Sequence, residues 1–343
     1  MTFKGLVARI TLTFIGVTGG SGAFSHAHAT SEFHWSLGPS LPLSVQEIYP
    51  AVHNNQIYVA GGLTAGKDKF SVSDQVFRIS ADADGWQTLP SFPAPTHHAM
   101  LASAGGSLWA FGGFTESEDG QWNNSSAVYQ FDEKQAEWVK RNPMPVRLSE
   151  SISAVINGKV HLAGGRTSKD DNYRWQHHLD SDWHGIFDPD SKVWQTGAPL
   201  PTPRNSACSV VYDNKWHVIG GRTVEGGNTN VHEVFDVSTD QWKTEKPMPE
   251  AAAGIACAVL DDSIFVFGGE YFDDQGGGVF YKVWRYELKR KRWSEAAVMP
   301  VPRHGLGAVT LDNAIWLIGG AAEAGPHDTR HTVSKFTLMK ATQ

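Results

Sequence analysis

Short runs of apolar residues recur along the chain, and each run ends in a pair of glycines. The glycine pairs end at Gly62, Gly113, Gly165, Gly221, Gly269 and Gly320. A second run containing a tryptophan precedes each pair, at Trp35, Trp86, Trp138, Trp194, Trp242 and Trp293, and both markers recur every 48 to 56 residues. A repeat of this length indicates an architecture built from copies of one unit.

Each repeat contains only strand-like patterns. Its apolar runs are short and end at turn residues, and no window keeps a helical period of 3.6 residues. Two-residue turns such as NG at 157–158 and DN at 213–214 separate the first two runs, as in tight hairpins. Four strands per repeat, six repeats and no helices predict an all-β fold, a six-bladed β-propeller with four antiparallel strands per blade.

The two ends of the repeat array complement each other. The last repeat stops after its third strand, TVSKFTLM at 332–339, whereas an unmatched tryptophan strand, FHWSLG at 33–38, precedes the first repeat. We expect this N-terminal strand to complete the sixth blade, because a closed ring leaves no open edge strand. Residues 30–343 are therefore expected to form a single propeller domain.

Residues 1–29 differ from the repeats. Lys4 and Arg9 precede an apolar stretch, which ends in AHA with Ala27 and Ala29 at small-residue positions. This pattern is typical of a secretory signal peptide, and its apolar stretch is too short and glycine-broken to span a bilayer. We expect a periplasmic or secreted protein without a membrane span.

The charge of the chain argues against one class of partner. The sequence has 29 Lys and Arg against 36 Asp and Glu, a net charge of −7, whereas binding to nucleic-acid phosphates needs a basic surface. One basic run, KRKR at 289–292, is interpreted as a solvated turn. We therefore expect no nucleic-acid partner.

Two cysteines, Cys208 and Cys257, fall on the first strands of the fourth and fifth repeats. Counted from their glycine pairs they have opposite parity, so across neighbouring blades their side chains can point toward each other. Export permits a disulfide between them, and two buried thiols are the alternative.

Polar residues gather where the first strands begin and directly after the glycine pairs. In a propeller these segments share one face, around the mouth of the central channel, and function often resides on such loops. The candidate site residues are Glu47, His97, Arg166, Arg204, Arg222, Glu270, Arg303 and His304.

The arginines and the glutamate Glu270 indicate what the site could bind and do. Several guanidinium groups converging on one cavity favour an anionic ligand, because the arginine fork matches a carboxylate. Glu270 is the only acidic residue directly after a glycine pair. It has two interpretations, an ion-pair partner of these arginines or a general acid or base.

The long loop at 166–185 concentrates further polar and aromatic residues. Its histidines and aspartates, His177, His178, Asp180, Asp182 and His184, match no zinc-binding pattern, so we expect no metal. Loops of this length often act as lids. Tyr173, Trp175 and Trp183 are expected to supply faces for a sugar ring.

The glycine pair, the aromatic position and the spaced tryptophan resemble kelch repeats over nearly all of the chain after residue 34. Among exported six-bladed kelch propellers, the chain resembles the N-acetylneuraminate epimerases, or sialic acid mutarotases. This resemblance implies a monomer that interconverts the anomers of an acidic sugar without a cofactor. Glu270 and His304 would be catalytic, and Arg166, Arg204, Arg222, Arg303, His97 and Glu47 would bind the substrate.

The sequence departs from that family in one respect. The family pairs such a glutamate with an arginine farther along the same loop, and residues 271–280 contain none, so the arginine would have to come from a neighbouring blade. A galactose-oxidase-like copper enzyme is disfavoured by six blades and no separate domains. The alternative function is a non-catalytic kelch module that binds a glycan or a protein.

Overall fold

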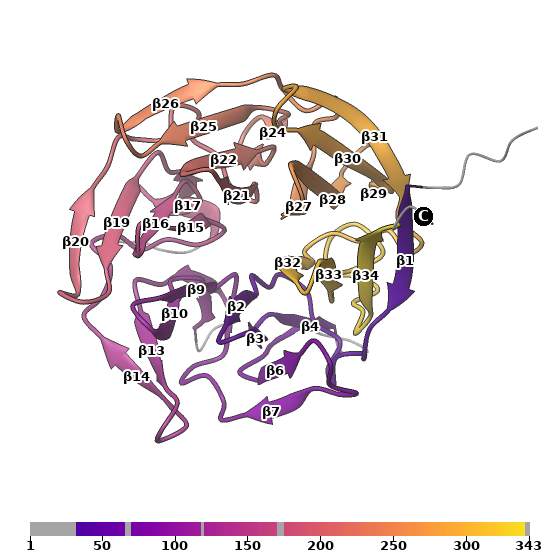
Figure 1. Ribbon diagram of the computed structural model, residues 1–343. Helices are drawn as coiled ribbons and strands as arrows, with labels where there is room; N and C mark the ends of the chain where they lie inside the picture. The colour runs from indigo at the N-terminus through magenta and orange to yellow at the C-terminus, as the bar shows by residue number, and fades with distance from the viewer. Residues whose placement is uncertain (1–31, 66–69, 118–119, 170–174, 340–343) are drawn as a thin grey trace, which may run out of the picture. The chain divides into compact units, whose positions relative to one another are not determined.

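The computed structural model describes residues 32–65, 70–117, 120–169 and 175–339. The predicted signal peptide at 1–29 lies outside the described residues. From Phe33 on, the chain forms one compact unit, and in Figure 1 its sheets are arranged around a common centre. The main strands of six sheets, the blades, follow from inside to outside.

Blade one contains β2 (Ala51–His53), β3 (Gln56–Ala60), β6 (Val76–Ser80) and β7 (Gln87–Leu89); blade two contains β9 (Met100–Ala104), β10 (Ser107–Phe111), β13 (Val128–Asp132) and β14 (Glu137–Arg141). Blade three contains β15 (Ile152–Ile156), β16 (Lys159–Ala163), β19 (His184–Asp188) and β20 (Val193–Thr196); blade four contains β21 (Cys208–Tyr212), β22 (Lys215–Ile219), β25 (His232–Asp236) and β26 (Gln241–Thr244). Blade five contains β27 (Ala253–Leu260), β28 (Ser263–Tyr271), β30 (Lys282–Glu287) and β31 (Arg292–Val298); blade six contains β32 (Gly307–Leu311), β33 (Ala314–Ile318), β34 (Val333–Leu338) and β1 (Phe33–Leu37).

Shorter elements lie near the first strands and in the loops between second and third strands. They are β4 (Leu63–Ala65), β5 (Phe70–Val72), β8 (Thr96–His97), β11 (Phe114–Glu116), β12 (Trp122–Asn124), β17 (Arg166–Ser168), the 3-10 helix η1 (Trp175–His177), β18 (His178–Asp180), β23 (Arg222–Thr223), β24 (Gly227–Asn228) and β29 (Gly278–Val279). The predicted all-β propeller is confirmed.

The N-terminal strand closes the ring, as predicted. β1 pairs antiparallel with β34, from Phe33 opposite Leu338 to Leu37 opposite Ser334. Trp35 lies opposite Phe336, the same cross-strand pair of a tryptophan and an aromatic residue that Phe131 and Trp138 form in blade two. The last blade is therefore built from both ends of the repeat array.

The hydrophobic core is divided among the interfaces between successive blades. One cluster of buried residues lies between blades five and six, and the next lies between blades six and one. Four further clusters join blades one to two, two to three, three to four and four to five. Each blade is thus packed on both faces, which is why its inner strands are almost continuously apolar.

The glycine pairs join neighbouring blades. Gly268 and Gly269 have φ of +65° and +99°, and a Cβ on Gly268 would lie 1.9 Å from the carbonyl oxygen of Arg303 in the next blade. The N–H of Gly269 donates to that same oxygen over 3.1 Å. Equivalent bonds run from Gly62 to Thr96, Gly113 to Leu148, Gly165 to Arg204, Gly221 to Ala252 and Gly320 to Val45. Glycine is needed because a side chain would occupy the space of this contact.

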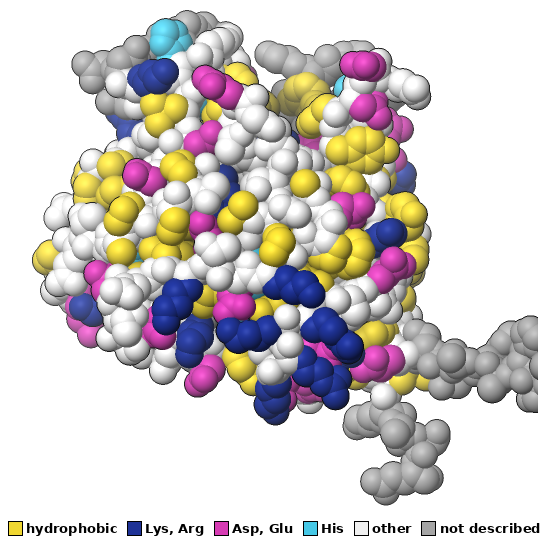
Figure 2. Space-filling model, turned by 90° about the horizontal axis from the view of Figure 1, so that it is seen from above, with side chains coloured by type: hydrophobic (Ala, Val, Ile, Leu, Met, Phe, Trp, Pro, Cys, Tyr) yellow, Lys and Arg dark blue, Asp and Glu magenta, His cyan; other side chains and the backbone are white. Residues whose placement is uncertain are grey.

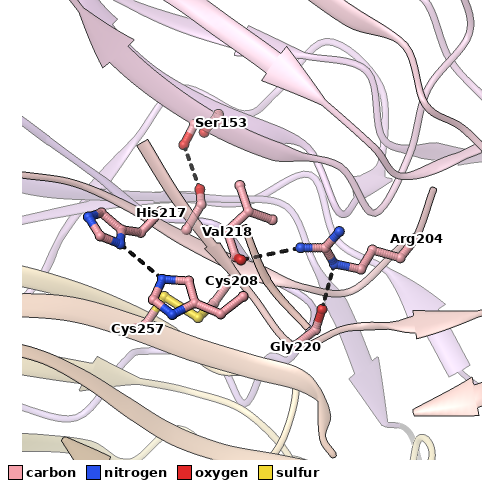
Figure 3. The surroundings of a disulfide bond; sticks show 9 residues. Ser153, Arg204, Cys208, His217, Val218, Gly220 and Cys257 are labelled. Atoms are coloured by element: carbon pink, nitrogen blue, oxygen red, sulfur yellow. Dashed lines mark hydrogen bonds between the residues drawn. A yellow bond between two sulfur atoms is a disulfide. The ribbon is translucent and has the colours of Figure 1, made fainter. Parts of the chain in front are cut away.

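Cys208 and Cys257 form a disulfide, with their Cα atoms 5.7 Å apart. The bond links the innermost strands of blades four and five, and Figure 3 shows its surroundings. Of the two alternatives that the sequence allows, the disulfide is therefore correct.

Two buried histidine pairs join the second and third strands of blades three and four. His161 Nδ1 lies 2.9 Å from His184 Nε2, and His217 Nδ1 lies 2.9 Å from His232 Nε2. Burial lowers the pKa of His161 and of His217 to about 4, and burial together with His217 lowers the pKa of His232 to about 3. The neutral rings are therefore part of the folded core.

The basic run at 289–292 is a solvated turn between β30 and β31, as predicted. Its side chains are exposed and pair with nearby carboxylates, among them Arg290 with Glu287 at 2.7 Å and Lys291 with Glu245 at 2.5 Å. Lys and Arg side chains gather near the lower edge of the face in Figure 2, with acidic side chains between them. Within the described residues, no helix has the length and apolar composition to cross a membrane.

Candidate functional site

A cavity of about 510 Å³ opens where the first strands begin. Below it, the first strands of all six blades surround a narrower space of about 140 Å³, the central channel. The cavity is lined by Gln46, Glu47, Leu63, His98, Trp122, Glu150, Arg166, Trp175, Gln176, His178, Asn205, Arg222, Thr223, Val224, Glu270, Phe272, His304, Gly325 and Pro326. Five of the eight predicted site residues are among them: Glu47, Arg166, Arg222, Glu270 and His304.

The same backbone geometry recurs in every blade and orients the side chains that line the cavity. The residue 15 positions before each glycine pair bridges the residue directly after the pair, as in Asn205 with Arg222 and Ala253 with Glu270. The next residue has a positive φ, which is 57° at Glu47 and 51° at Glu150. Non-glycine residues rarely adopt this conformation, so its recurrence around the channel marks a constrained ring.

Glu270 is buried and held from three sides. Its Oε1 accepts a 2.7 Å hydrogen bond from Arg222 Nη1, and its Oε2 accepts one of 2.7 Å from the N–H of Gly325. His304 Nδ1 lies 3.4 Å from the same Oε2. This arginine comes from blade four, next to the blade that carries Glu270.

His304 lies between two carboxylates. Its Nε2 is 2.7 Å from the carbonyl oxygen of Gly325, so this nitrogen carries a proton. Its Nδ1 lies 3.4 Å from Glu270 Oε2 and 3.6 Å from Glu47 Oε1. His304 therefore connects the carboxylate of blade five with that of blade one.

Glu47 belongs to a second carboxylate–imidazole pair. Its Oε2 lies 2.7 Å from His98 Nε2, and His98 Nδ1 lies 2.7 Å from His97 Nδ1. Burial alone would favour the neutral acid, but the charge and hydrogen bond of His98 outweigh it and hold the pKa of Glu47 well below its ordinary value. Glu47 is therefore an ionised carboxylate in the wall of the cavity.

Glu150 lies deeper and faces two guanidinium groups. Arg166 Nη1 is 3.6 Å from its Oε1, Arg222 Nη2 is 4.0 Å from its Oε2, and Ser206 Oγ donates to Oε2 over 2.6 Å. Burial opposes ionisation, but His98 and the two arginines lower the pKa of Glu150. Burial also disfavours the charge of Arg222, but Glu150 and Glu270 raise its pKa above the ordinary value.

Aromatic side chains line one part of the cavity. The guanidinium carbon of Arg166 lies 3.5 Å from the ring centre of Trp175, a cation–π contact. Trp122 and Phe272 complete this part of the lining. Of the loop aromatics predicted to face a sugar, Trp175 does line the cavity, Trp183 packs beside Trp194 in the core between blades two and three, and Tyr173 lies outside the described residues.

Arg204 does not line the cavity. Its guanidinium is fully buried and ion-paired with Glu233 at 2.5 Å, and Figure 3 shows it bonded to the carbonyls of Val218 and Gly220. Arg204 lies 16 positions before the first glycine of its pair. We call this count the rank of a residue, and in the other blades the residues of the same rank are Val45, Thr96, Leu148, Ala252 and Arg303. That rank supplies the carbonyls bound by the glycine pairs, so its side chains pack between blades.

Arg303 and His97 also lie behind the cavity wall. Arg303 is fully buried, its Nη2 lies 3.5 Å from Ser334 Oγ, and burial together with Arg330 lowers its pKa to about 10. His97 does not line the cavity itself, but packs against Phe114 and against two lining residues, His98 and Trp122. The sequence predicts that the side chains of Arg303 and His97 contact a ligand. The structure instead places them behind the residues that line the cavity.

The sequence prediction omitted several lining residues that occupy the same position in their repeat as a predicted residue. His98 and Glu150 share the rank of Glu47, 14 positions before the glycine pair, and Asn205 shares the rank of His304. Phe272 and Gly325 lie in loops without a repeated pattern, so only the structure brings them to the site. Among the residues that the structure describes, no group of three or more His, Cys, Asp or Glu could hold a metal ion.

Known proteins share this fold. The KLHDC2/KLHL20/DRC7 Kelch-repeats domain matches residues 154–339. Kelch-like protein terF of Aspergillus terreus is 27% identical over 307 residues, which cover 85% of this chain and 65% of terF. Kelch-like protein 35 of Homo sapiens is 34% identical over 245 residues, which cover 71% of this chain and 38% of that protein.

The solved structure of YjhT superposes with a TM-score of 0.75 and 19% identity, covering 88% of this chain and 97% of that one. At this identity the likeness concerns the fold alone. The chain spans less than two thirds of the length of the curated relatives named above. Because a kelch-repeats domain matches more than half of the chain, the chain belongs to the kelch-repeat family.

Proposed function

We propose that this propeller binds an acidic sugar such as N-acetylneuraminate in the cavity at the channel mouth and interconverts its anomers without a cofactor. One observation carries the proposal. A buried carboxylate, Glu270, contacts both an arginine and an imidazole in the wall of an aromatic-lined cavity. Groups that can give or take a proton within hydrogen-bond reach of a sugar are what anomer exchange requires.

Glu270 acts on the anomeric hydroxyl in this proposal. It takes the hydroxyl proton as the bond between the anomeric carbon and the ring oxygen breaks, and it returns a proton when the ring closes on the other face. Arg222 and the N–H of Gly325 fix the carboxylate in position. A carboxylate has about four lone-pair sites, so these contacts leave room for the hydroxyl.

Arg166 binds the carboxylate of the sugar in this proposal. Its guanidinium is loosely paired with Glu150 at 3.6 Å, and the described residues supply no hydrogen-bond acceptor for its buried Nε. Trp175 fixes the plane of the guanidinium by stacking, which suits bidentate binding of a carboxylate. Trp122 and Phe272 offer apolar faces to the sugar ring.

The decisive experiment is anomer exchange in freshly dissolved N-acetylneuraminate, followed by NMR with and without the protein. We expect the protein to accelerate the approach to anomeric equilibrium. Freshly dissolved glucose, which lacks a carboxylate, is the control and should equilibrate at the uncatalysed rate. An unchanged rate with N-acetylneuraminate would refute the catalytic proposal.

A non-catalytic binding module is the second candidate. Exposed aromatic residues at the mouth, Phe272 at 62% and Tyr271 at 39% exposure, offer a surface to a glycan or a protein. Binding of N-acetylneuraminate without faster anomer exchange, measured by titration calorimetry, would favour this candidate.

We also propose that the protein is exported to the periplasm or beyond the cell. The disulfide between Cys208 and Cys257 supports this proposal, because disulfides persist in oxidising compartments. Intact mass of the exported protein should give a mature chain that starts near Thr30. A retained N-terminus would contradict the proposal.

A further inference from the structure

We infer that Glu47 is a second catalytic carboxylate of this site and that His304 passes a proton between Glu47 and Glu270. The inference rests on the proposed anomer exchange and adds a path for the protons. It is carried by a series of contacts from blade five through blades six and one to blade two.

The series begins at Glu270 and ends at His97. Glu270 Oε2 lies 3.4 Å from His304 Nδ1, and Glu47 Oε1 lies 3.6 Å from the same nitrogen. The other oxygen of Glu47 lies 2.7 Å from His98, which in turn lies 2.7 Å from His97. Because Nε2 of His304 is bound to a carbonyl, Nδ1 is the nitrogen that can exchange a proton with either carboxylate.

Exposure indicates which group meets the ligand. The side chain of Glu47 is 13% exposed, compared with 4% for Glu270 and 1% for Glu150. The imidazole of His304 is only 1% exposed. Glu47 is thus the most accessible of these three carboxylates, whereas His304 acts behind the two carboxylates that it connects.

His98 is a positioning residue for Glu47. It holds Oε2 and leaves Oε1 turned toward His304. The contact with His97 and an edge-to-face packing against Phe114 restrain the ring of His98. A carboxylate fixed at one oxygen keeps the other in place for proton exchange.

The protons balance along this path. As the ring opens, the anomeric hydroxyl gives its proton to Glu270, which passes it to Nδ1 of His304. His304 passes the proton on to Glu47, and Glu47 delivers it to the ring oxygen. The bond between the anomeric carbon and the ring oxygen breaks, and the carbonyl forms. The three side chains are then back in their starting state, and ring closure on the other face reverses these steps. No other reactant is consumed.

The test is Glu47→Gln, which keeps the size of the side chain but cannot carry a proton. We expect kcat for anomer exchange of N-acetylneuraminate to fall on the order of 100-fold, while KM stays within about threefold. Glu133→Gln is the matched control, because Glu133 also contacts a buried histidine, His53 at 3.2 Å, but lies outside the cavity lining. It should retain both constants.

Two further measurements separate a proton carrier from a structural residue. Formate added to Glu47→Ala should restore part of the lost kcat, because the small carboxylate can occupy the vacated position. In mixtures of H2O and D2O, kcat of the unaltered protein should depend on the deuterium fraction along a curve, since several protons move in one step. A linear dependence would overturn the shared path, even where the variants fail to fold.

The outcomes distinguish this inference from the proposed function. Faster anomer exchange by the unaltered protein, combined with wild-type kcat in folded Glu47→Gln, overturns the inference alone. A higher KM with an unchanged kcat in Glu47→Gln also overturns it, because Glu47 would then only bind the sugar. No acceleration by the unaltered protein refutes the proposed function, and the inference with it.

Discussion

At the scale of single residues, the arginines of this chain fall into two classes that look alike in the sequence. Arg222 reaches the cavity and pairs with Glu270 at 2.7 Å, whereas Arg204 is enclosed between blades and pairs with Glu233 at 2.5 Å. The two classes differ in their position relative to the glycine pair, because Arg222 directly follows the pair and Arg204 lies 16 positions before it. It predicts opposite effects of substitution at the two kinds of position.

Glu270→Gln should keep the fold and much of the sugar binding, and should slow anomer exchange on the order of a hundredfold or more. The amide retains the shape and one acceptor oxygen for Arg222 but cannot take a proton. Melting, titration with N-acetylneuraminate and NMR rates on the same preparation check this expectation. If turnover is unchanged while stability or affinity shifts, Glu270 is an ion-pair partner only.

Arg204→Met should lower the free energy of unfolding by about 3 to 5 kcal/mol, because it leaves the buried carboxylate of Glu233 without its partner. Sugar affinity of the remaining folded protein should not change. Denaturant titration measures the first effect and calorimetry the second. The double variant Arg204→Met with Glu233→Leu should recover most of the loss. Full stability with lost sugar affinity would mean that Arg204 reaches the ligand.

At the scale of elements, the closing strand and the histidine pairs carry separate consequences. β1 is far from the rest of blade six in sequence, yet it pairs with β34 along its whole length and stacks Phe33 on Phe336 at 4.9 Å. The histidine pairs join second and third strands within single blades.

Deleting residues 30–40 should lower the melting temperature of the whole propeller rather than remove a tail. The deletion exposes the edge of β34 and part of the core between blades five and six. Calorimetry of the deletion variant measures this effect. Leu37→Ser, at a side chain that is 78% exposed, is the control and should melt as the unaltered protein does. An unchanged melting temperature after deletion would contradict closure by β1.

Acidification should destabilise the protein between pH 6.5 and about 4. Burial lowers the pKa of His217 to about 4, against an ordinary value of 6.5, so in this range the unfolded chain binds more protons and stability falls as pH falls. Each such histidine contributes on the order of 1 to 3 kcal/mol. Between pH 6.5 and 4, the melting temperature of the double variant His217→Gln with His232→Gln should fall less steeply than that of the unaltered protein. The melting temperature of His34→Gln, a substitution at an exposed position, should fall as steeply as that of the unaltered protein. Equal slopes in all three proteins would contradict the argument.

At the scale of the whole molecule, stability is shared among six similar interfaces, and one of them is covalently reinforced. The disulfide joins blades four and five across 49 residues of sequence. The other interfaces rely on apolar packing and the backbone bonds of the glycine pairs. The ring therefore has one interface that reduction can weaken selectively.

Cys208→Ala with Cys257→Ala should lower the free energy of unfolding by about 2 to 4 kcal/mol. The cross-link restricts the unfolded chain, so its removal should leave the folded ring and anomer exchange unchanged. Denaturant titration of the double variant, with and without reductant, checks the effect. Reductant should destabilise the unaltered protein alone. A loss of anomer exchange in a folded double variant would contradict a purely structural disulfide.

The architecture can be predicted from the amino-acid sequence alone. Six glycine pairs and six tryptophans at regular spacing determine the blade count, and the unmatched strand at 33–38 determines how the ring closes. The sequence also locates the face of the site, because polar residues such as Glu47 and Glu270 interrupt otherwise apolar strand ends. These features are local and repeated, so each copy supports the interpretation of the others.

Which of the polar residues meet in the cavity depends on how the six blades pack together. Arg204 precedes a first strand and Arg222 directly follows a glycine pair, so the sequence assigns both to the polar channel mouth, but the backbone contact between blades turns Arg204 away from the channel. Glu47 and Glu270 stand more than 200 residues apart in sequence, and ring closure brings both to His304. Side-chain direction and contacts across the ring depend on how the blades pack, and the sequence of no single repeat contains that information.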